Sequence, residues 1–258
     1  SLKALPLKLT YNRVDHKEGM ATYFREYLRG VMTAPKPVKS TYRGWQMQKY
    51  YEDSLAWETN PLYGWCAKNK KKDGTNYNVY TDGLKIYTTL NSHMQQYAEE
   101  AVEEHLSVLQ PLFFKEKVGS KNAPYARSIS AKLVEELLTK AMKQTDRYRL
   151  MNEAGASEQE IRKAFDTPQE MTVFSWTGAK DTIMTPMDSI RYYKSFLRTG
   201  FMSMDPLNGH VKAYVGGPNY VYFQYDMAMV GRRQVGSTIK PYLYTLAMEN
   251  NFSPCDQV

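Results

Sequence analysis

The sequence predicts an α+β fold in which helices pack on a small antiparallel sheet. Long segments with helical periodicity alternate with short β-branched runs, and no internal repeat or βαβ pattern appears. Two of these runs, LKIYTTL at 84–90 and VKAYV at 211–215, share one alternating pattern. We therefore expect them to lie in one antiparallel sheet.

The first half of the chain predicts three helical regions. Residues 19–32 carry apolar and aromatic side chains at helical spacing, and residues 41–65 show a weaker periodicity with many aromatics. Packing inside a domain explains these aromatics better than stacking on carbohydrate or peptide. Asn91 is a candidate N-cap for a long amphipathic helix over Ser92–Leu109, which Pro111 is expected to end.

The second half predicts three further helices and two strands. Helices are expected over Ser130–Met151, over Ser157–Phe165, where Ser157 and Glu160 form a capping box, and over 185–202. In that last helix Asp188 is the candidate N-cap and Gly200 the candidate stop. Strands are expected at 171–176 and, after a turn, within 205–217.

Composition excludes some classes of function but does not identify a single one. The 258 residues carry a formal net charge of +7, but the basic residues are scattered, and the one dense run, at 68–74, has the composition of a solvated loop. Such a charge suits anionic lipid or an anionic polymer as well as nucleic acid. The two cysteines and four histidines are dispersed, so we expect no metal site and no cofactor. No stretch is long and apolar enough to cross a membrane, and both ends resemble internal cut points, which suggests a piece of a longer protein.

Ser237 and Lys240 are the candidate catalytic residues. Positions i and i+3 share one helix face, so the Ser237 hydroxyl and the Lys240 amine could come within hydrogen-bond reach. Serine is a weak nucleophile unless a base takes its proton, and a lysine can serve only when neutral. Gly236 would let a substrate approach the backbone closely. The spacing alone, however, favours a simple helix cap, because one such Ser-x-x-Lys match is expected by chance in a chain of this length.

The wider sequence around Ser237 changes that balance. RQVGSTIKPYLYTLAMENNFSP at 233–254 closely resembles the active-serine segment of the class A, bifunctional penicillin-binding proteins. Three further blocks resemble parts of the same family: DPLNGHVKAYVGGPNY at 205–220, GLKIYTTLNSHMQQYAEEAV at 83–102 and LPLKLTYN at 5–12. Residues 111–185 match least well and are expected to hold a lineage-specific insertion.

The resemblance implies a site and a reaction. Ser237 would attack the D-Ala-D-Ala end of a peptidoglycan stem peptide to form an acyl-enzyme, and Lys240 would activate it. Gly236 and Thr238 would contact substrate, the backbone N–H of Ser237 would form half of an oxyanion hole, and β-lactams would acylate Ser237. The longer protein would also polymerise glycan strands from lipid II in a glycosyltransferase domain outside this chain. It would sit on the periplasmic face of the bacterial inner membrane through an anchor outside this chain, with cell-wall assembly proteins as partners and no nucleic acid.

The resemblance also implies a domain organisation. Residues 1–83 would be the exit of a glycosyltransferase domain and a linker. Residues 84–204 would hold a linker strand and helix with a mainly helical insertion, and 205–258 the start of a transpeptidase domain. The family's second S-x-N motif and its K-T/S-G strand have no counterpart after Lys240, so we expect the isolated chain to be inactive and to expose apolar surface on YLYTLAM. Residues 218–258 are expected to be poorly ordered, rearranged or packed against another copy.

Two other hypotheses remain open. The chain could be a non-catalytic periplasmic interaction module in which Ser237 merely caps a helix. It could also belong to a stand-alone serine hydrolase such as a β-lactamase or carboxypeptidase, although the linker-like blocks upstream argue against this.

Overall fold

The α+β prediction is confirmed, but the strands form two separate antiparallel pairs instead of one sheet. The computed structural model describes residues 17–120 and 122–256, so the block LPLKLTYN lies outside the described residues. The elements in order are α1 Thr22–Met32, α2 Met47–Thr59, α3 Trp65–Lys68, α4 Ser92–Lys117, α5 Ala131–Lys143, α6 Asp146–Glu153, α7 Glu158–Asp166, β1 Gln169–Val173, β2 Lys180–Met184, α8 Pro186–Lys194, β3 Phe201–Met204, β4 Val211–Val215 and α9 Lys240–Glu249, with short 3₁₀ turns η2 Lys39–Thr41, η3 Gly44–Gln46 and η4 Gly236–Ile239.

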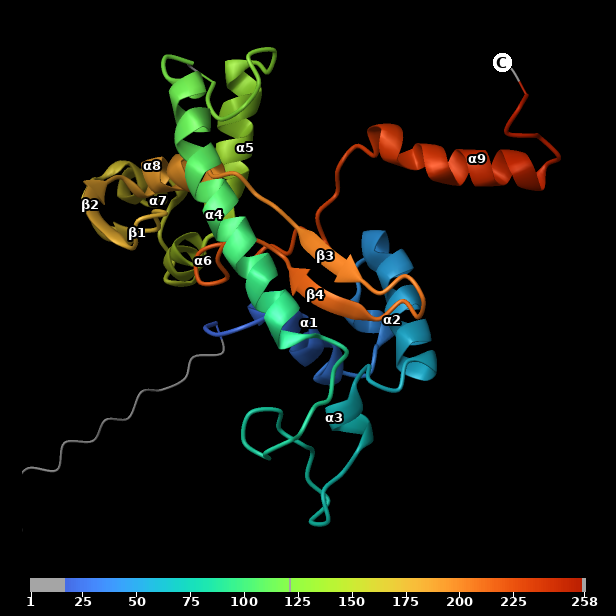
Figure 1. The fold of residues 1–258 in the computed structure, drawn as a ribbon. Helices are drawn as coiled ribbons and strands as arrows, with labels where there is room; N and C mark the ends of the chain where they lie inside the picture. The colour runs from blue at the N-terminus through green and yellow to red at the C-terminus, as the bar shows by residue number, and fades with distance from the viewer. Residues whose placement is uncertain (1–16, 121, 257–258) are drawn as a thin grey trace, which may run out of the picture.

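Helix α4 crosses the molecule and connects its two halves (Figure 1). Helices α5 to α8 and the β1–β2 hairpin gather around one end of α4, and the β3–β4 hairpin packs on the other end. Helix α9 stands apart from both halves (Figure 1). Within the described residues, no helix combines the length and the apolar character that crossing a membrane would require.

Three apolar clusters hold these elements together. The first joins α5, α7 and α8 through Leu138, Met142, Ile161, Phe165 and Met187. The second packs Ala98 of α4 against Ala213 and Val215 of β4. The third is aromatic and centres on Phe174, Phe196 and Phe223, three rings that come from separate segments of the chain.

Helix α4 starts where the sequence predicts but does not end at Pro111. The Asn91 side chain accepts from the Met94 N–H at 3.0 Å, as an N-cap does. The helix then continues through Pro111 to Lys117. A proline removes only one backbone donor, and tertiary contacts on both sides hold this part of the helix in place: the buried Gln110 bonds Ser195 and Leu197, and Phe114 packs edge-on against Phe196 at 5.7 Å.

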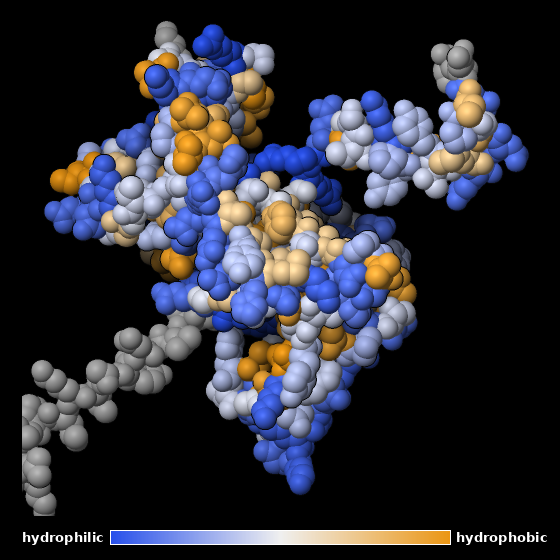
Figure 2. Space-filling view, viewed as in Figure 1, coloured by the Kyte–Doolittle hydropathy of each residue, from blue (hydrophilic) through white to orange (hydrophobic). Residues whose placement is uncertain are grey.

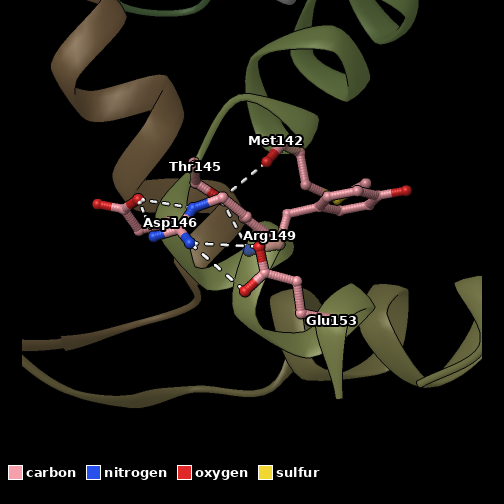
Figure 3. A network of polar contacts seen from close by, with 6 residues as sticks. Met142, Thr145, Asp146, Arg149 and Glu153 are labelled. Atoms are coloured by element: carbon pink, nitrogen blue, oxygen red, sulfur yellow. Dashed lines mark hydrogen bonds and ion pairs between the residues drawn. The ribbon is translucent and has the colours of Figure 1, made fainter. Parts of the chain in front are cut away.

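The region expected to be one helix over 130–151 is two. Thr145 separates α5 from α6: its hydroxyl donates to the Met142 carbonyl at 2.7 Å and accepts from the Tyr148 N–H at 3.2 Å (Figure 3). Arg149 then pairs with Asp146 at 3.0 Å and with Glu153 at 3.4 Å on the surface of α6. The threonine N-cap is a local signal that the apolar periodicity hides.

Helix α7 confirms the predicted capping box. The Ser157 hydroxyl accepts from the Glu160 N–H at 3.3 Å, and the Glu160 carboxylate accepts from the Ser157 N–H at 2.8 Å.

Helix α8 is shorter than predicted and is capped one turn earlier. Thr185 is the N-cap. Asp188 lies in the first turn, and its carboxylate accepts a hydrogen bond from the Thr185 hydroxyl at 2.8 Å. The helix ends at Lys194, so Gly200 does not stop it, and residues 201–202 belong to strand β3. A side chain at Gly200 would collide with the backbone of Ala228, which explains the glycine there.

The predicted pairing of 84–90 with 211–215 is wrong, although the two segments lie side by side. Strand β4 pairs with β3, with Phe201 opposite Val215. Residues 84–90 form no strand, but the Thr89 hydroxyl donates to the Val211 carbonyl at 2.8 Å and the Asn91 N–H donates to the Lys212 carbonyl at 2.9 Å. The strand predicted at 171–176 is present as β1 but covers 169–173. Its partner strand β2 was not predicted.

Candidate functional site

The four predicted site residues lie together at the start of α9. Gly236, Ser237 and Thr238 form the 3₁₀ turn η4, and Lys240 is the first residue of α9. Gly236 has a φ of +51°, in the left-handed region that glycine adopts most easily. Pro241 in the first helical turn is tolerated because its missing N–H would have had no helical partner.

Ser237 does not cap this helix. The N-cap of η4 is Val235 and that of α9 is Ile239, and neither uses a side chain for capping. The local polar contacts belong to Thr238, whose N–H donates to the Val235 carbonyl at 3.2 Å and whose hydroxyl donates to the same carbonyl. The simple alternative, that a serine here serves to start a helix, therefore lacks the hydrogen bond that it requires.

The candidate nucleophile and the candidate base are both exposed to solvent. Ser237 and Lys240 are exposed, and neither the Ser237 Oγ nor the Lys240 Nζ forms a hydrogen bond with another described residue. A lysine acts as a general base only when it is neutral, and the described residues do not bury Lys240 in the way that favours the neutral form. The described residues supply a serine, a lysine one turn away and a glycine of positive φ, but they form no wall that would hold a substrate.

Helix α9 is exposed along its whole length. None of its residues is buried, and its apolar side chains face solvent; these are Tyr242, Leu243, Tyr244, Leu246 and Met248. Figure 2 shows the helix standing clear of the body. The expected exposed apolar surface on YLYTLAM is therefore confirmed, and the burial of this helix in a core does not occur among the described residues.

The segment between β4 and η4 is tightly folded at its start. The Met227 N–H donates to the Gly216 carbonyl at 2.7 Å. The Asp226 carboxylate accepts from the Ala228 and Met229 N–H groups at 2.9 and 3.1 Å and from the Tyr214 hydroxyl at 2.5 Å. Burial and this carboxylate raise the pKa of Tyr214 well above its ordinary value.

Two apolar grooves lie elsewhere on the described part of the chain. An apolar groove of about 490 Å³ lies between α4 and residues 199–203, and a second of about 470 Å³ lies between α1 and residues 79–90. Neither contains Ser237 or Lys240. Among residues 17–120 and 122–256, no group of histidine, cysteine, aspartate and glutamate side chains has the arrangement of a metal site.

Sequence reasoning missed the side chains that anchor this part of the molecule. Gln95 and Gln110 of α4 are both 1% exposed and bond the backbone of other segments, and Tyr23 of α1 donates to the Phe223 carbonyl. No local pattern indicates these roles, because each contact joins residues at least 85 positions apart.

Comparison with known proteins shows that the chain is similar to penicillin-binding proteins. Residues 120–197 match a family model described as the penicillin-binding protein middle domain. Penicillin-binding protein 2D of Bacillus subtilis is 29% identical over 160 residues, which cover 62% of this chain and 20% of that protein. Penicillin-binding protein 1A of Aquifex aeolicus is 26% identical over 66% of this chain and 23% of the relative, and that of Escherichia coli is 26% identical over 68% and 24%. No solved structure matches the chain.

These matches cover about a fifth to a quarter of the relatives' length. The family model, described as a middle domain, covers most of residues 111–185, the stretch expected to hold a lineage-specific insertion.

Proposed function

We propose that this chain belongs to the penicillin-binding protein family and carries the nucleophile of a D-Ala-D-Ala transpeptidase. The observation that supports this most is the segment RQVGSTIKP, in which Ser237 and Lys240 lie one turn apart behind a glycine of positive φ. The absence of a capping bond to Ser237 removes the simplest structural reason for a serine at this position.

The proposed reaction is acyl transfer in two steps. Ser237 Oγ attacks the carbonyl carbon of the penultimate D-alanine while Lys240, in its neutral form, takes the hydroxyl proton. The amide bond to the terminal D-alanine breaks, the proton passes to the leaving amine, and an ester to Ser237 remains. The amine of a second stem peptide then attacks this ester, which forms the cross-link and returns the proton to Ser237. The Ser237 N–H would stabilise the oxyanion, and Gly236 and Thr238 would contact the substrate.

In this proposal the chain is the middle of a longer peptidoglycan synthase. Residues 1–83 leave a glycosyltransferase domain, 84–204 form the linker and middle region, and 205–258 begin the transpeptidase domain. The synthase would polymerise lipid II and be held at the periplasmic face of the inner membrane by an anchor outside this chain. Stem peptides and β-lactams would be its ligands and cell-wall assembly proteins its partners.

Labelling with a fluorescent penicillin tests the nucleophile. In the full-length protein that contains this chain, Ser237→Ala should abolish covalent labelling, because no other group would form the ester. Ser157→Ala, which removes a helix cap far from the site, is the control and should leave labelling intact. Labelling that persists in Ser237→Ala would overturn the assignment. The isolated 258-residue chain should label weakly, because Ser237 and Lys240 are exposed and the described residues enclose no pocket around them.

A non-catalytic interaction module remains the second candidate. It is favoured by one observation: the family-model match covers 120–197 and not the serine segment. A full-length protein that folds but takes no penicillin label would support this alternative.

A further inference from the structure

Tyr23 of α1 connects the beginning of the described chain to the segment that leads to Ser237. Its hydroxyl donates to the Phe223 carbonyl at 2.6 Å, across 200 positions of sequence, and the two residues are 7% and 2% exposed. Burial raises the pKa of Tyr23 far above its ordinary value, so the hydroxyl keeps its proton and remains a donor.

Two glycines make room for the Tyr23 ring. A Cβ at Gly216 would lie 2.6 Å from Tyr23 Cδ1, and one at Gly217 would overlap the Tyr23 hydroxyl. The ring therefore lies directly on bare backbone, with the Tyr220 ring edge-on to it at 4.9 Å. Contact this close means that a shift of Tyr23 must be transmitted to residues 216–217.

Phe223 holds a third part of the chain at the same point. Its ring packs against Phe174 at 5.1 Å and Phe196 at 5.5 Å, and the Arg198 guanidinium lies 3.9 Å above it. Phe174 and Phe196 belong to the stretch that matches the middle-domain model. We call this meeting point of Tyr23, Gly216, Gly217, Arg198 and Phe223 the Phe223 joint.

The Phe223 joint lies close to the catalytic segment along the chain. Backbone bonds from Val230 and Gly231 to the Asp226 carbonyl, at 3.1 and 3.0 Å, close the segment that follows the joint. Ser237 follows Gly231 by six residues, and a chain of six residues can span at most about 20 Å. The joint reaches this segment through the backbone bond from the Met227 N–H to the Gly216 carbonyl, and the resulting position of Gly231 limits where Ser237 can lie.

We infer that Tyr23 is a positioning residue for Ser237: through the Phe223 joint, helix α1 and the middle region together set the starting point of the segment that presents the serine. The inference rests on the proposed function, since it concerns the reaction at Ser237. It assigns to a tyrosine more than 200 positions upstream a role in acylation without contact with substrate.

The test compares two tyrosine-to-phenylalanine variants of the full-length protein. Tyr23→Phe removes the hydroxyl bond to Phe223. Tyr192→Phe is the matched control, because the Tyr192 hydroxyl also donates to a backbone carbonyl, that of Phe174 at 2.7 Å, but forms no bond to residues 216–231. Each variant loses one hydrogen bond of the same kind, so both should lower the melting temperature by a similar amount.

Only Tyr23→Phe should slow the chemistry. At a temperature where both variants are fully folded, we expect acylation at saturating fluorescent penicillin to slow by about three- to tenfold in Tyr23→Phe and by less than about twofold in Tyr192→Phe. Hydrogen exchange should accelerate across 224–231 in Tyr23→Phe alone. Equal acylation rates and equal exchange in the two variants would overturn the inference.

The two proposals fail in different ways. A wild-type protein that takes no label overturns the proposed function, and the exchange measurement still tests the joint. A labelled wild type with an unaffected Tyr23→Phe variant overturns the positioning role and leaves the nucleophile assignment standing.

Discussion

Helices α5 and α9 contain similar proportions of apolar residues but differ completely in burial. In α5, Leu138 is 2% exposed and Met142 is 1% exposed, because α7 and α8 cover one face of the helix. In α9, Leu243 is 53% exposed and no residue is buried. A helix with apolar residues around most of its circumference normally lies inside a core. Composition therefore determines how much apolar surface a helix has to bury. The described residues bury this surface for α5 and leave it exposed in α9.

The same substitution in the two helices should have the largest difference in effect. Leu138→Ala should lower the free energy of unfolding by about 2–5 kcal/mol, because it removes buried methyl groups and leaves a cavity. Leu243→Ala should change it by less than about 0.5 kcal/mol, since the side chain already contacts water. Urea denaturation of the two variants measures both values. A cost at Leu243 that approaches that at Leu138 would mean that α9 is packed in solution.

The next comparison is between Ser157 at the start of α7 and Ser237 just before α9. Ser157→Ala removes the capping box of α7 and should cost about 1 kcal/mol of unfolding free energy. Ser237→Ala should cost less than about 0.5 kcal/mol, because Ser237 caps nothing. Denaturation curves collected side by side decide this, and a substantial loss in Ser237→Ala would show that the serine has a structural role after all.

The smallest effect is expected from a surface carboxylate. Glu158 of α7 accepts from the Tyr148 hydroxyl at 2.6 Å and from the Lys143 amine at 2.9 Å, and these bonds hold the pKa of Glu158 below its ordinary value. A lowered folded-state pKa means that the stabilisation is present above about pH 4.3 and is lost as pH falls through the folded pKa.

Glu158→Gln should therefore lower the melting temperature slightly at pH 7, and the difference from wild type should vanish in acid. Glu249→Gln on α9 is the control, because Glu249 forms no ion pair with the described residues, and it should have no effect at either pH. A difference for Glu158→Gln that grows as pH falls would contradict the sign of this argument.

The sequence predicted some of the local features and missed the long-range contacts. The cap at Asn91 and the box at Ser157 were predictable because each depends on residues three positions apart. The continuation of α4 through Pro111 was not, since it depends on contacts of Gln110 and Phe114 with residues 195–197.

The candidate site shows the same division. Ser237 and Lys240 could be named from a short motif and from the resemblance around it. The Tyr23 contact with Phe223 could not, because nothing in GMATYF marks one tyrosine as the partner of a carbonyl 200 positions away. Motifs report the chemistry that a segment can perform, and they carry little information on what holds that segment in place.

Two glutamines of α4 bind the backbone of two other segments and so set the spacing between those segments. The Gln95 amide bonds both the carbonyl and the N–H of Tyr214, at 2.8 and 2.7 Å, and the Gln110 amide bonds the Ser195 carbonyl and the Leu197 N–H, at 3.0 and 2.8 Å. Because Gln95 and Gln110 lie fifteen helical residues apart, their two sets of hydrogen bonds are separated by about 22 Å along the helix axis and by a fixed angle around it. Deleting one residue between them would turn one amide by about 100° away from its target. The interval from 95 to 110 therefore tolerates no change in length.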